Sequence, residues 1–388
     1  MNIILFDDTR RDNLRPLTFM RPIADIRFGI LTIREKWERY FGIPTSTLTE
    51  PYLSIKYPVV KKPDNILING AICPTPELVA AIKALKPNHA LVRKENIFAM
   101  RIAEEALHNG SDSYLQSVEE VETSFECLEI SNTWDIFALN EKAIHEDFML
   151  ITNGRKSQNL SNTNRFTGGD IFIEEGAVVE FATLNATAGP IYIGKKAEIM
   201  EGAMLRGPLA ICEHAAIKMG AKIYGATTIG PHSKIGGEVV NSVLFGYSNK
   251  AHDGYMGNSV LAEWCNIGAG TNFSNLKNTY DSIRIWNYPG QTFVNTGLQF
   301  CGMIMGDHSK CGINTMFNTG TVVGVNCNIF GSGFQRNFIS SFQWGGTAGF
   351  VNYDLKRAIK VAEAVYIRRD REFSQVDKAI FEAVFNLI

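Results

Sequence analysis

The histidines of this chain differ in their surroundings, and one of them stands where chemistry can occur. His252 lies in the segment Lys250-Ala-His-Asp-Gly-Tyr-Met-Gly257, which interrupts an otherwise regular pattern. An imidazole titrates near pH 6.5 and can therefore accept a proton from a reacting group at neutral pH. By contrast, His214, His232 and His308 each occupy the same outward position of a repeat, which predicts surface residues. His252 is the candidate general base, although a lone loop histidine can also be a surface residue.

A second polar stretch follows shortly after His252. It reads Asn266-Ile-Gly-Ala-Gly-Thr271, and Asn275 comes after it. These glycines have a structural explanation, because glycine tolerates the positive φ of a tight corner. They therefore do not by themselves decide between a functional and a structural role.

In the regular pattern that these segments interrupt, an aliphatic residue recurs at every sixth position. Shorter runs of the same spacing begin at Ile173, Leu261 and Met305, and the longest run contains eight aliphatic residues: Ile193, Ile199, Leu205, Ile211, Ile217, Ile223, Ile229 and Ile235. Neither a helix nor a plain strand has this period. A hexapeptide repeat does, because it folds into a triangular β-helix with the aliphatic residues pointing inward. About six coils at about 4.8 Å each predict a prism about 30 Å long.

Length and composition exclude several classes of protein. A chain of 388 residues exceeds what one core usually holds, which predicts two domains. The formal net charge of −2 argues against a nucleic-acid partner. No apolar run approaches the ~18 residues of a membrane span, so we expect no membrane insertion. The seven cysteines contain no CxxC pair, and the first apolar residues favour a strand over a signal peptide, which together predict a cytoplasmic protein.

Strand and helix signals divide the chain into parts. They alternate near the N-terminus, with strands expected at Asn2 to Phe6 and Asn65 to Asn69 and helices at Ile30 to Tyr40 and Pro76 to Leu85. The sequence predicts an α/β domain over 1–152, a linker rich in Asn, Ser and Thr over 153–164, the β-helix over 165–345, and C-terminal capping helices over 346–388.

At His252 a family resemblance becomes specific. The order His252, Tyr255, Gly257, then the Asn266 to Thr271 stretch and Asn275, resembles the acetyltransferase half of the bifunctional N-acetylglucosamine-1-phosphate uridyltransferase/glucosamine-1-phosphate acetyltransferases. The spacing of that family's motif is kept without a gap. The resemblance implies a left-handed parallel β-helix, a homotrimer with active sites between neighbouring prisms, and acetyl-CoA as cosubstrate.

The resemblance also assigns roles to residues. It implies that His252 is the general base and that Tyr255, Asn266, Asn275 and the basic Lys222 contact the sugar substrate. It places Ala269, with Gly268 and Gly270, in the coenzyme A groove.

The chemistry agrees with these roles. An amino-sugar nitrogen must lose a proton before it attacks a thioester, and a histidine that takes this proton typically contributes ~10²–10⁴ in rate. Backbone N–H groups around Gly268 to Gly270 could then stabilise the oxyanion. However, Val240 stands at another basic position of the family, and Ile313 replaces a serine near the acyl group. The acceptor amino sugar therefore remains open.

The front domain resembles the nucleotidyltransferase half of the same family. Arg15-Pro-Leu-Thr18 matches its opening, but Asp7-Asp-Thr-Arg-Arg-Asp-Asn13 has no glycine where the family's loop holds the nucleotide phosphates. Ala71 stands where a metal-binding aspartate is expected. These losses favour a degenerate domain kept for assembly or ligand sensing. The alternative is a rebuilt nucleotide site at Asp7, Arg10 and Arg15, and only that alternative calls for a metal, Mg²⁺.

The sequence thus predicts an α/β nucleotidyltransferase-like domain followed by an acetyl-CoA-dependent acyltransferase. Its predicted substrate is an amino sugar, as the 1-phosphate or a related sugar nucleotide, in the synthesis of sugar-nucleotide and cell-envelope precursors. One alternative is a sugar-1-phosphate nucleotidyltransferase that transfers a uridylyl or thymidylyl group. Another is a non-catalytic trimeric scaffold or sugar-nucleotide sensor.

Overall fold

The computed structural model describes residues 2–94, 96–108 and 118–388, and the chain divides into two compact units. The N-terminal unit contains Met1–Leu14, Met20–Ile26 and Leu31–Ser131. The solenoid unit contains Arg15–Phe19, Arg27–Ile30 and Asn132–Ile388. Two short segments from the front of the chain therefore belong to the solenoid unit.

A mixed sheet with the strand order β2-β1-β3-β5-β4-β6 forms the N-terminal unit. β1 is parallel to β2 and β3, β5 is antiparallel to β3 and β4, and β6 is parallel to β4. Buried Ile4, Leu67 and Met100 from three neighbouring strands belong to one core cluster. The strands are β1 (Asn2–Phe6), β2 (Ser46–Leu48), β3 (Asp64–Asn69), β4 (His89–Arg93), β5 (Asn96–Ala103) and β6 (Glu119–Glu122).

Short helices connect these strands: α1 (Arg10–Asn13), α2 (Ile33–Phe41), α3 (Pro51–Ser54), α4 (Pro76–Ala84) and the 3₁₀ helices η1 (Ile23–Asp25) and η2 (Glu104–His108). The second helix begins three residues later than the sequence predicted. Thr32 is the reason, because its side chain accepts a hydrogen bond from the Glu35 amide while the Glu35 carboxylate accepts one from the Thr32 amide. This capping box fixes the start of α2.

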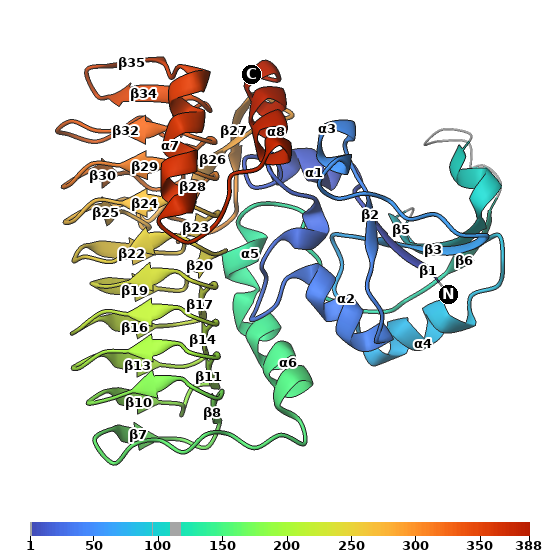
Figure 1. Ribbon diagram of the computed structural model, residues 1–388, viewed down its shortest axis with the longest axis horizontal. Coiled ribbons are helices and arrows are strands. Elements are labelled where there is room, and N and C mark those ends of the chain that lie inside the picture. The colour runs from blue at the N-terminus through green and yellow to red at the C-terminus, as the bar shows by residue number, and fades with distance from the viewer. Residues whose placement is uncertain (1, 95, 109–117) are drawn as a thin grey trace. The chain divides into compact units, whose positions relative to one another are not determined.

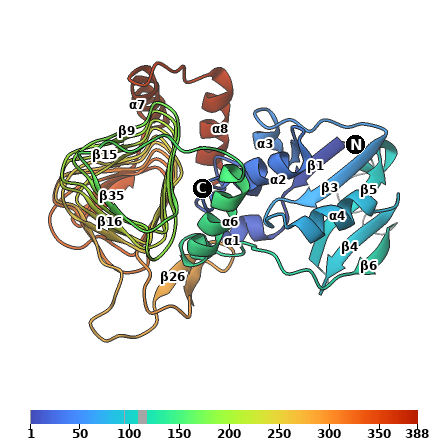
Figure 2. The ribbon, with the colours of Figure 1, turned by 90° about the horizontal axis from the view of Figure 1, so that it is seen from below.

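The solenoid consists of stacked coils, whose strands form three parallel sheets. These sheets are the three sides of a triangular prism (Figure 2). The first sheet consists of β7 (Arg165–Thr167), β10 (Thr183–Asn185), β13 (Met204–Arg206), β16 (Lys222–Tyr224), β19 (Glu238–Val240), β22 (Tyr255–Gly257), β25 (Asn272–Phe273) and β30 (Met316–Phe317). The second consists of β8 (Ile171–Ile173), β11 (Ile191–Ile193), β14 (Leu209–Ile211), β17 (Thr227–Ile229), β20 (Val243–Leu244), β23 (Val260–Leu261), β28 (Met303–Met305), β31 (Thr321–Val323) and β33 (Phe338–Ile339).

The third sheet ends in an antiparallel pair. It consists of β9 (Val178–Val179), β12 (Glu198–Ile199), β15 (Ala216–Ile217), β18 (Lys234–Ile235), β21 (Asn249–Lys250), β24 (Asn266–Ile267), β29 (Lys310–Cys311), β32 (Asn328–Ile329), β34 (Gln343–Gly346) and β35 (Gly349–Asn352). We call these three the first, second and third sheets of the prism.

Stacked aliphatic residues fill the prism, as the six-residue count predicted. Ile193, Ile211 and Ile229 are register partners in the second sheet, and all three are fully buried. Each coil therefore buries its aliphatic row against the coils on either side.

The solenoid is longer than predicted. Its sheets contain eight, nine and ten strands, which makes about ten coils where about six were expected. The six-residue count was lost between Val240 and Leu261, because the coils in that region are shorter. Ile229 pairs with Leu244 after 15 residues instead of 18, and Leu244 pairs with Leu261 after 17. The coils continue through this region, although the count of six is lost.

One true insertion leaves the solenoid. Between β25 and β28 the chain forms the antiparallel hairpin of β26 (Arg284–Asn287) and β27 (Thr292–Asn295), seen beside the prism in Figure 2. Its Trp286 ring stacks on Phe338 of β33, with ring centroids 4.2 Å apart. The hairpin is thereby fixed to the second sheet.

Four helices complete the solenoid unit: α5 (Asp135–Ala138), α6 (Asn140–Thr152), α7 (Leu355–Ile367) and α8 (Gln375–Asn386). α7 and α8 lie along the side of the last coils (Figure 1), and not across the open end as expected. Ring contacts hold them there, since Tyr366 stacks on Trp264 at 4.0 Å and Phe381 meets His308 at 4.8 Å. His308 is therefore buried, contrary to the prediction of a surface residue.

The predicted fold class is confirmed: an α/β N-terminal domain, a left-handed parallel β-helix and C-terminal helices. Among the described residues, no helix is both long and apolar enough to cross a membrane.

Candidate active site

The turn that carries His252 joins the third sheet to the first. It runs from β21 to β22, at one edge of the prism. The His252 imidazole is exposed, and it makes no hydrogen bond within the described part of the chain. What positions this residue is therefore its backbone.

A buried lysine holds that backbone. Lys250 takes an interior position between Ile235 and Ile267, where the two neighbouring coils place an aliphatic residue, and only 2% of it is exposed. Its Nζ donates to the carbonyl oxygen of His252 at 2.5 Å and to that of Gly236 at 3.1 Å. Burial lowers the pKa of Lys250 to about 8, although the charge of Asp253 opposes this shift.

This contact changes the hydrogen bonding between coils. At two other corners on the same prism edge, an amide donates to the residue before its own register partner, as Gly220 does to Glu201 and Asn314 to Ala269. Gly270 instead donates to Asp253, one residue further along, at 3.0 Å. The His252 carbonyl is thereby left to the Lys250 ammonium. We infer that Lys250 orients the turn on which the imidazole is carried.

The strand register of the third sheet places residues of the predicted site next to one another along this edge. Continued past the pairing of Ile267 with Cys311, this register aligns His252, Ala269 and Ile313 on three successive coils. Neighbouring coils are about 4.8 Å apart, so the predicted base adjoins the predicted coenzyme A position. Ile313 is 72% exposed, which leaves an apolar side chain on the surface of the edge.

The glycines on either side of Ala269 are needed for the packing and hydrogen bonding of the coils. The Gly268 amide donates to Cys311 at 3.1 Å, and that of Gly270 to Asp253. A Cβ at Gly268 would lie 2.3 Å from the Gly312 backbone of the next coil. Two of the three amides expected to serve an oxyanion are thus already bonded. The Ala269 amide, for which the described residues show no acceptor, is the remaining candidate.

Tyr255 and Asn275 come together on the first sheet. The Asn275 amide nitrogen donates to the Tyr255 hydroxyl at 3.0 Å and to the Asn258 side-chain oxygen at 2.8 Å. Burial raises the pKa of Tyr255, whose hydroxyl thus stays protonated at neutral pH. Gly257 lies beneath this contact, where a Cβ would come within 2.4 Å of both polar atoms.

The other two predicted substrate residues lie apart from this pair. Lys222 is exposed on the same first sheet but two strands away, because Glu238 pairs with both Lys222 and Tyr255. Asn266 is exposed on the third sheet, between Asn249 and Lys310. Asn266 and Tyr255 therefore lie on opposite sides of the edge that carries His252.

In the N-terminal unit, the two acids that could hold a metal are already engaged. The Asp7 side chain is only 6% exposed; it accepts from the Ile23 amide at 2.8 Å and pairs with Arg11 at 2.8 Å. Burial raises the pKa of Asp7 despite that pairing. Asp8 pairs with Arg10 at 2.7 Å, and although burial opposes it, Arg10 lowers the pKa of this carboxyl.

The residues of the predicted nucleotide site contact other side chains within their own units. Arg10 is taken up by Asp8 and by Glu129 at 3.0 Å. Arg15 belongs to the solenoid unit, where its guanidinium lies 5.3 Å from the Phe19 ring centroid. No group of three or more metal-ligating side chains occurs in the described ranges. The residues present do not fit a Mg²⁺ site.

Sequence reasoning missed Lys250 and Gly257 as site residues. A lysine that follows Ser248 and Asn249 is typical of a solvated loop, and only the coil register reveals that Lys250 points inward. For Gly257 a signal was available, because it is one of the residues that the resemblance rests on. What the sequence could not provide was the contact above it.

Comparisons with known proteins agree with the resemblance. Over 205 residues the chain is 31% identical to the bifunctional sugar-1-phosphate nucleotidylyltransferase/acetyltransferase of Sulfurisphaera tokodaii. The matched region covers 52% of this chain and 44% of that protein. Over 90 residues it is 32% identical to the bifunctional protein GlmU of Methanocaldococcus jannaschii, covering 23% of this chain and 21% of the relative. Each match spans less than half of the relative's length.

Solved structures match parts of the chain only with low scores. The polysialic acid-specific acetyltransferase NeuO is 13% identical, with a TM-score of 0.26, over 49% of this chain and 82% of its own. AntD, an N-acyltransferase from Bacillus cereus in complex with dTDP and 3-hydroxybutyryl-CoA, is 12% identical, with a TM-score of 0.24, over 53% and 91%. Scores this low support no common function.

The N-terminal part of the chain also matches a family model. Residues 3–156 fit the sugar nucleotidyl transferase family. The predicted resemblance is confirmed: the chain is similar to the GlmU-like bifunctional sugar-1-phosphate nucleotidylyltransferase/acetyltransferases.

Proposed function

We propose that this chain is an acetyltransferase that moves the acetyl group of acetyl-CoA to the amine of a sugar. The observation that carries the proposal is the prism edge on which Lys250 anchors the His252 turn, one coil from Ala269 and beside the Tyr255–Asn275 contact. The similarity to bifunctional nucleotidylyltransferase/acetyltransferases supports the same reaction.

The proposed chemistry needs one proton acceptor and one oxyanion donor. His252 removes a proton from the ammonium group of the acceptor, and the free amine then attacks the thioester carbon. The Ala269 amide stabilises the oxygen of the tetrahedral intermediate. The C–S bond breaks as the C=O bond re-forms, and coenzyme A leaves as a thiolate. This thiolate takes up the second proton, which the nitrogen loses as the neutral amide forms.

Polar groups around the edge suit a sugar acceptor. The Tyr255 hydroxyl and the Asn275 amide offer donors and acceptors to sugar hydroxyls. The exposed Lys222 ammonium on the same sheet supports a phosphorylated sugar. Other nearby cations are committed within the insertion, since Lys277 donates to the Ser282 carbonyl and Arg284 to that of Phe293. We therefore propose an amino-sugar 1-phosphate or a related sugar nucleotide.

The proposal includes a homotrimer. His252 is exposed in the single chain, so a second prism is needed to close the site around the substrate. Light scattering should give three times the 43.1 kDa mass of one chain. We also propose that the reaction takes place in the cytoplasm, because the seven cysteines contain no CxxC pair and six of them are buried.

The decisive experiment is release of the coenzyme A thiol from acetyl-CoA, measured over a panel of amino sugars that includes glucosamine 1-phosphate. One panel member should be acetylated, and His252→Ala should lower kcat by about 10²–10⁴ without changing the melting temperature. His214→Ala is the matched control, because it removes another exposed corner histidine. Equal activity of wild type and His252→Ala would refute the role of His252.

A second function, sugar-1-phosphate nucleotidyl transfer, is favoured by the family match of residues 3–156. Exchange of labelled pyrophosphate into UTP or dTTP, with and without Mg²⁺, tests it. Because Asp7 and Asp8 are held by arginines, we expect no Mg²⁺-dependent exchange. Exchange that disappears in Asp8→Asn would establish this second function.

A further inference from the structure

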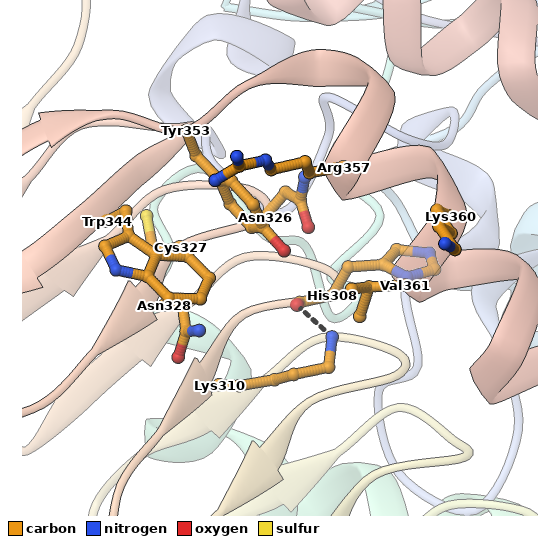
Figure 3. Close-up of a pocket in the computed structure, with 10 residues that line it drawn as sticks. All are labelled: His308, Lys310, Asn326, Cys327, Asn328, Trp344, Tyr353, Arg357, Lys360 and Val361. Carbon is orange, nitrogen blue, oxygen red and sulfur yellow. Dashed lines mark hydrogen bonds between the residues drawn. The ribbon is translucent and has the colours of Figure 1, made fainter.

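A pocket lies between the prism and helix α7, away from the His252 edge. Its floor consists of residues from β29, β32 and β34 of the third sheet, and α7 forms its roof. The cavity measures about 290 Å³, near the lower end of small-molecule sites. Figure 3 shows Trp344 on one side of it and Lys360 with Val361 on the other. None of the residues proposed above for acetyl transfer lines this cavity.

The lining of this pocket is positively charged. Lys310 on the floor and Arg357 and Lys360 on α7 contribute three cations, and no residue that lines the pocket is acidic. Within the described ranges, none of these three side chains forms an ion pair. The Lys310 ammonium donates to the His308 carbonyl at 2.7 Å, as Figure 3 shows. Burial lowers the pKa of Lys310 to about 8.

A buried amide adds a further donor. The Asn326 side chain lines the pocket and is 2% exposed, and its amide nitrogen has no hydrogen-bond acceptor in the described structure. Most buried polar side-chain atoms in proteins have a partner. Solvated surface cations would explain Arg357 and Lys360, but neither the desolvated Lys310 nor the orphaned Asn326 amide. An oxyanion in the pocket would satisfy both.

An aromatic face borders the charged groups. The Trp344 ring is 39% exposed and meets Tyr353 edge to face, with ring centroids 4.9 Å apart. This contact fixes the indole and leaves part of its surface open to the pocket. An exposed indole held rigidly can stack on a flat ring at little cost in conformational freedom.

We propose that this pocket binds an organic phosphate that carries a planar ring, such as a nucleotide. The phosphate lies among Lys310, Arg357 and the Asn326 amide, with Lys360 at the entrance, and the ring stacks on Trp344. Such a ligand could be a free nucleotide or the nucleotide end of coenzyme A. The inference does not depend on acetyl transfer, because it concerns binding alone.

Calorimetric titration of the full chain tests this inference. The probes are UMP, adenosine 3′,5′-bisphosphate as the nucleotide end of coenzyme A, the nucleosides uridine and adenosine, and inorganic phosphate. At least one nucleotide should bind, and its nucleoside and inorganic phosphate should each bind at least 10-fold more weakly. Preference for UMP would identify a free nucleotide as the ligand, and preference for the bisphosphate would identify coenzyme A.

Variants locate the binding. Arg357→Gln and Lys310→Met should each weaken the nucleotide at least 10-fold, and Trp344→Leu should weaken it as well. Lys356→Gln is the matched control, since it removes an exposed cation of α7 that does not line the pocket. His252→Ala should bind as wild type does, which separates this inference from the proposed catalysis. The proposal is overturned if no nucleotide binds, or if Arg357→Gln and Lys356→Gln have the same effect.

Discussion

Lys250 is the residue at which the packing rule of the solenoid and the needs of the site conflict. An aliphatic side chain at its position would continue the interior row, as Ile235 and Ile267 do on either side. A buried ammonium costs free energy unless its donors are satisfied. Here two of them reach carbonyl oxygens, one of which belongs to His252. Burying the ammonium thus lowers the stability of the fold, but its hydrogen bond holds the backbone of the His252 turn in place.

This reading predicts a pH dependence of stability. The pKa of Lys250 is about 8 in the fold and 10.5 as the ordinary value, so the unfolded chain binds more protons between these limits. Stability therefore rises with pH across this window and levels off below about pH 8. Between pH 7.5 and 9, wild type should gain about 1 kcal/mol relative to Lys250→Met.

Urea unfolding at several pH values measures this difference. Lys234→Met serves as the control, because Lys234 is an exposed neighbour on the same sheet and its removal should leave the pH dependence unchanged. If wild type and Lys250→Met follow parallel curves, the ammonium is not desolvated in the way the fold implies. The same variant should also lower kcat of acetyl transfer, since the His252 turn loses its anchor.

Gly257 carries a second prediction. A Cβ there would overlap the Asn275 amide and the Tyr255 hydroxyl, so Gly257→Ala should force the two side chains apart. If both contact the sugar, KM for the amino sugar should rise about 10-fold or more, while KM for acetyl-CoA stays the same. Tyr255→Phe should raise the same KM. An unchanged KM in both variants would remove this pair from the sugar site.

Among the elements, predictability from sequence depended on strict periodicity. The run from Ile193 to Ile235 determined three-sided coils, because one aliphatic residue per six can be buried in no other regular element. Periodicity failed after Ile229, where coils of 15 and 17 residues keep the packing while losing the count. It also could not show that α7 and α8 lie on the side of the prism, since an amphipathic helix does not identify its partner surface.

A ladder of rings runs along the prism edge between the second and third sheets. His214, His232, Tyr247, Trp264 and His308 occupy one corner position on successive coils, each with positive φ. Their ring centroids are 4.3 to 6.1 Å apart. Left-handed backbone at residues other than glycine costs ~1–2 kcal/mol each. We infer that stacking along the ladder offsets part of this cost.

Trp264 is the centre of this ladder, because it stacks on Tyr247 within it and on Tyr366 of α7. Trp264→Ala should lower the free energy of unfolding by about 3 kcal/mol. It should also increase the hydrogen exchange of α7, which loses its main ring contact. His214→Ala, at the exposed end of the ladder, should cost less than ~1 kcal/mol. Equal costs for the two variants would mean that the ladder contributes little to stability.

At the scale of the whole molecule, the motif spacing predicted the local parts of the candidate site but not its completion. Continued past the pairing of Met256 with Phe273, the register places Asn275 beside Asn258 of the preceding coil, from where its amide reaches Tyr255. Asn266 lies on another face of the prism, and no spacing within one chain can show what meets it there. The engagement of Asp7 and Asp8 by arginines also depends on tertiary packing, which the two acidic letters do not reveal.

A short segment from the front of the chain, Arg27–Ile30, contributes to the solenoid unit. The Arg27 Nε donates to the Phe245 carbonyl at 3.0 Å, and the Thr228 hydroxyl donates to that of Gly29 at 2.9 Å. Asn140 of α6 donates to the Ala226 carbonyl at 2.8 Å and accepts from the Gly29 amide at 2.9 Å. The segment is therefore built into the wall of the prism.

A fragment of residues 132–388 keeps every coil but lacks this segment. Its solenoid should unfold at a lower urea concentration than that of the full chain, with a loss of about 2–4 kcal/mol, because several buried groups lose their partners at about 1 kcal/mol or more each. Arg27→Ala in the full chain should reproduce part of this loss, since it leaves the Phe245 carbonyl without its donor. The comparison is made by far-ultraviolet circular dichroism, which follows the β-helix. If fragment and full chain share one midpoint, residues 1–131 contribute nothing to the stability of the solenoid.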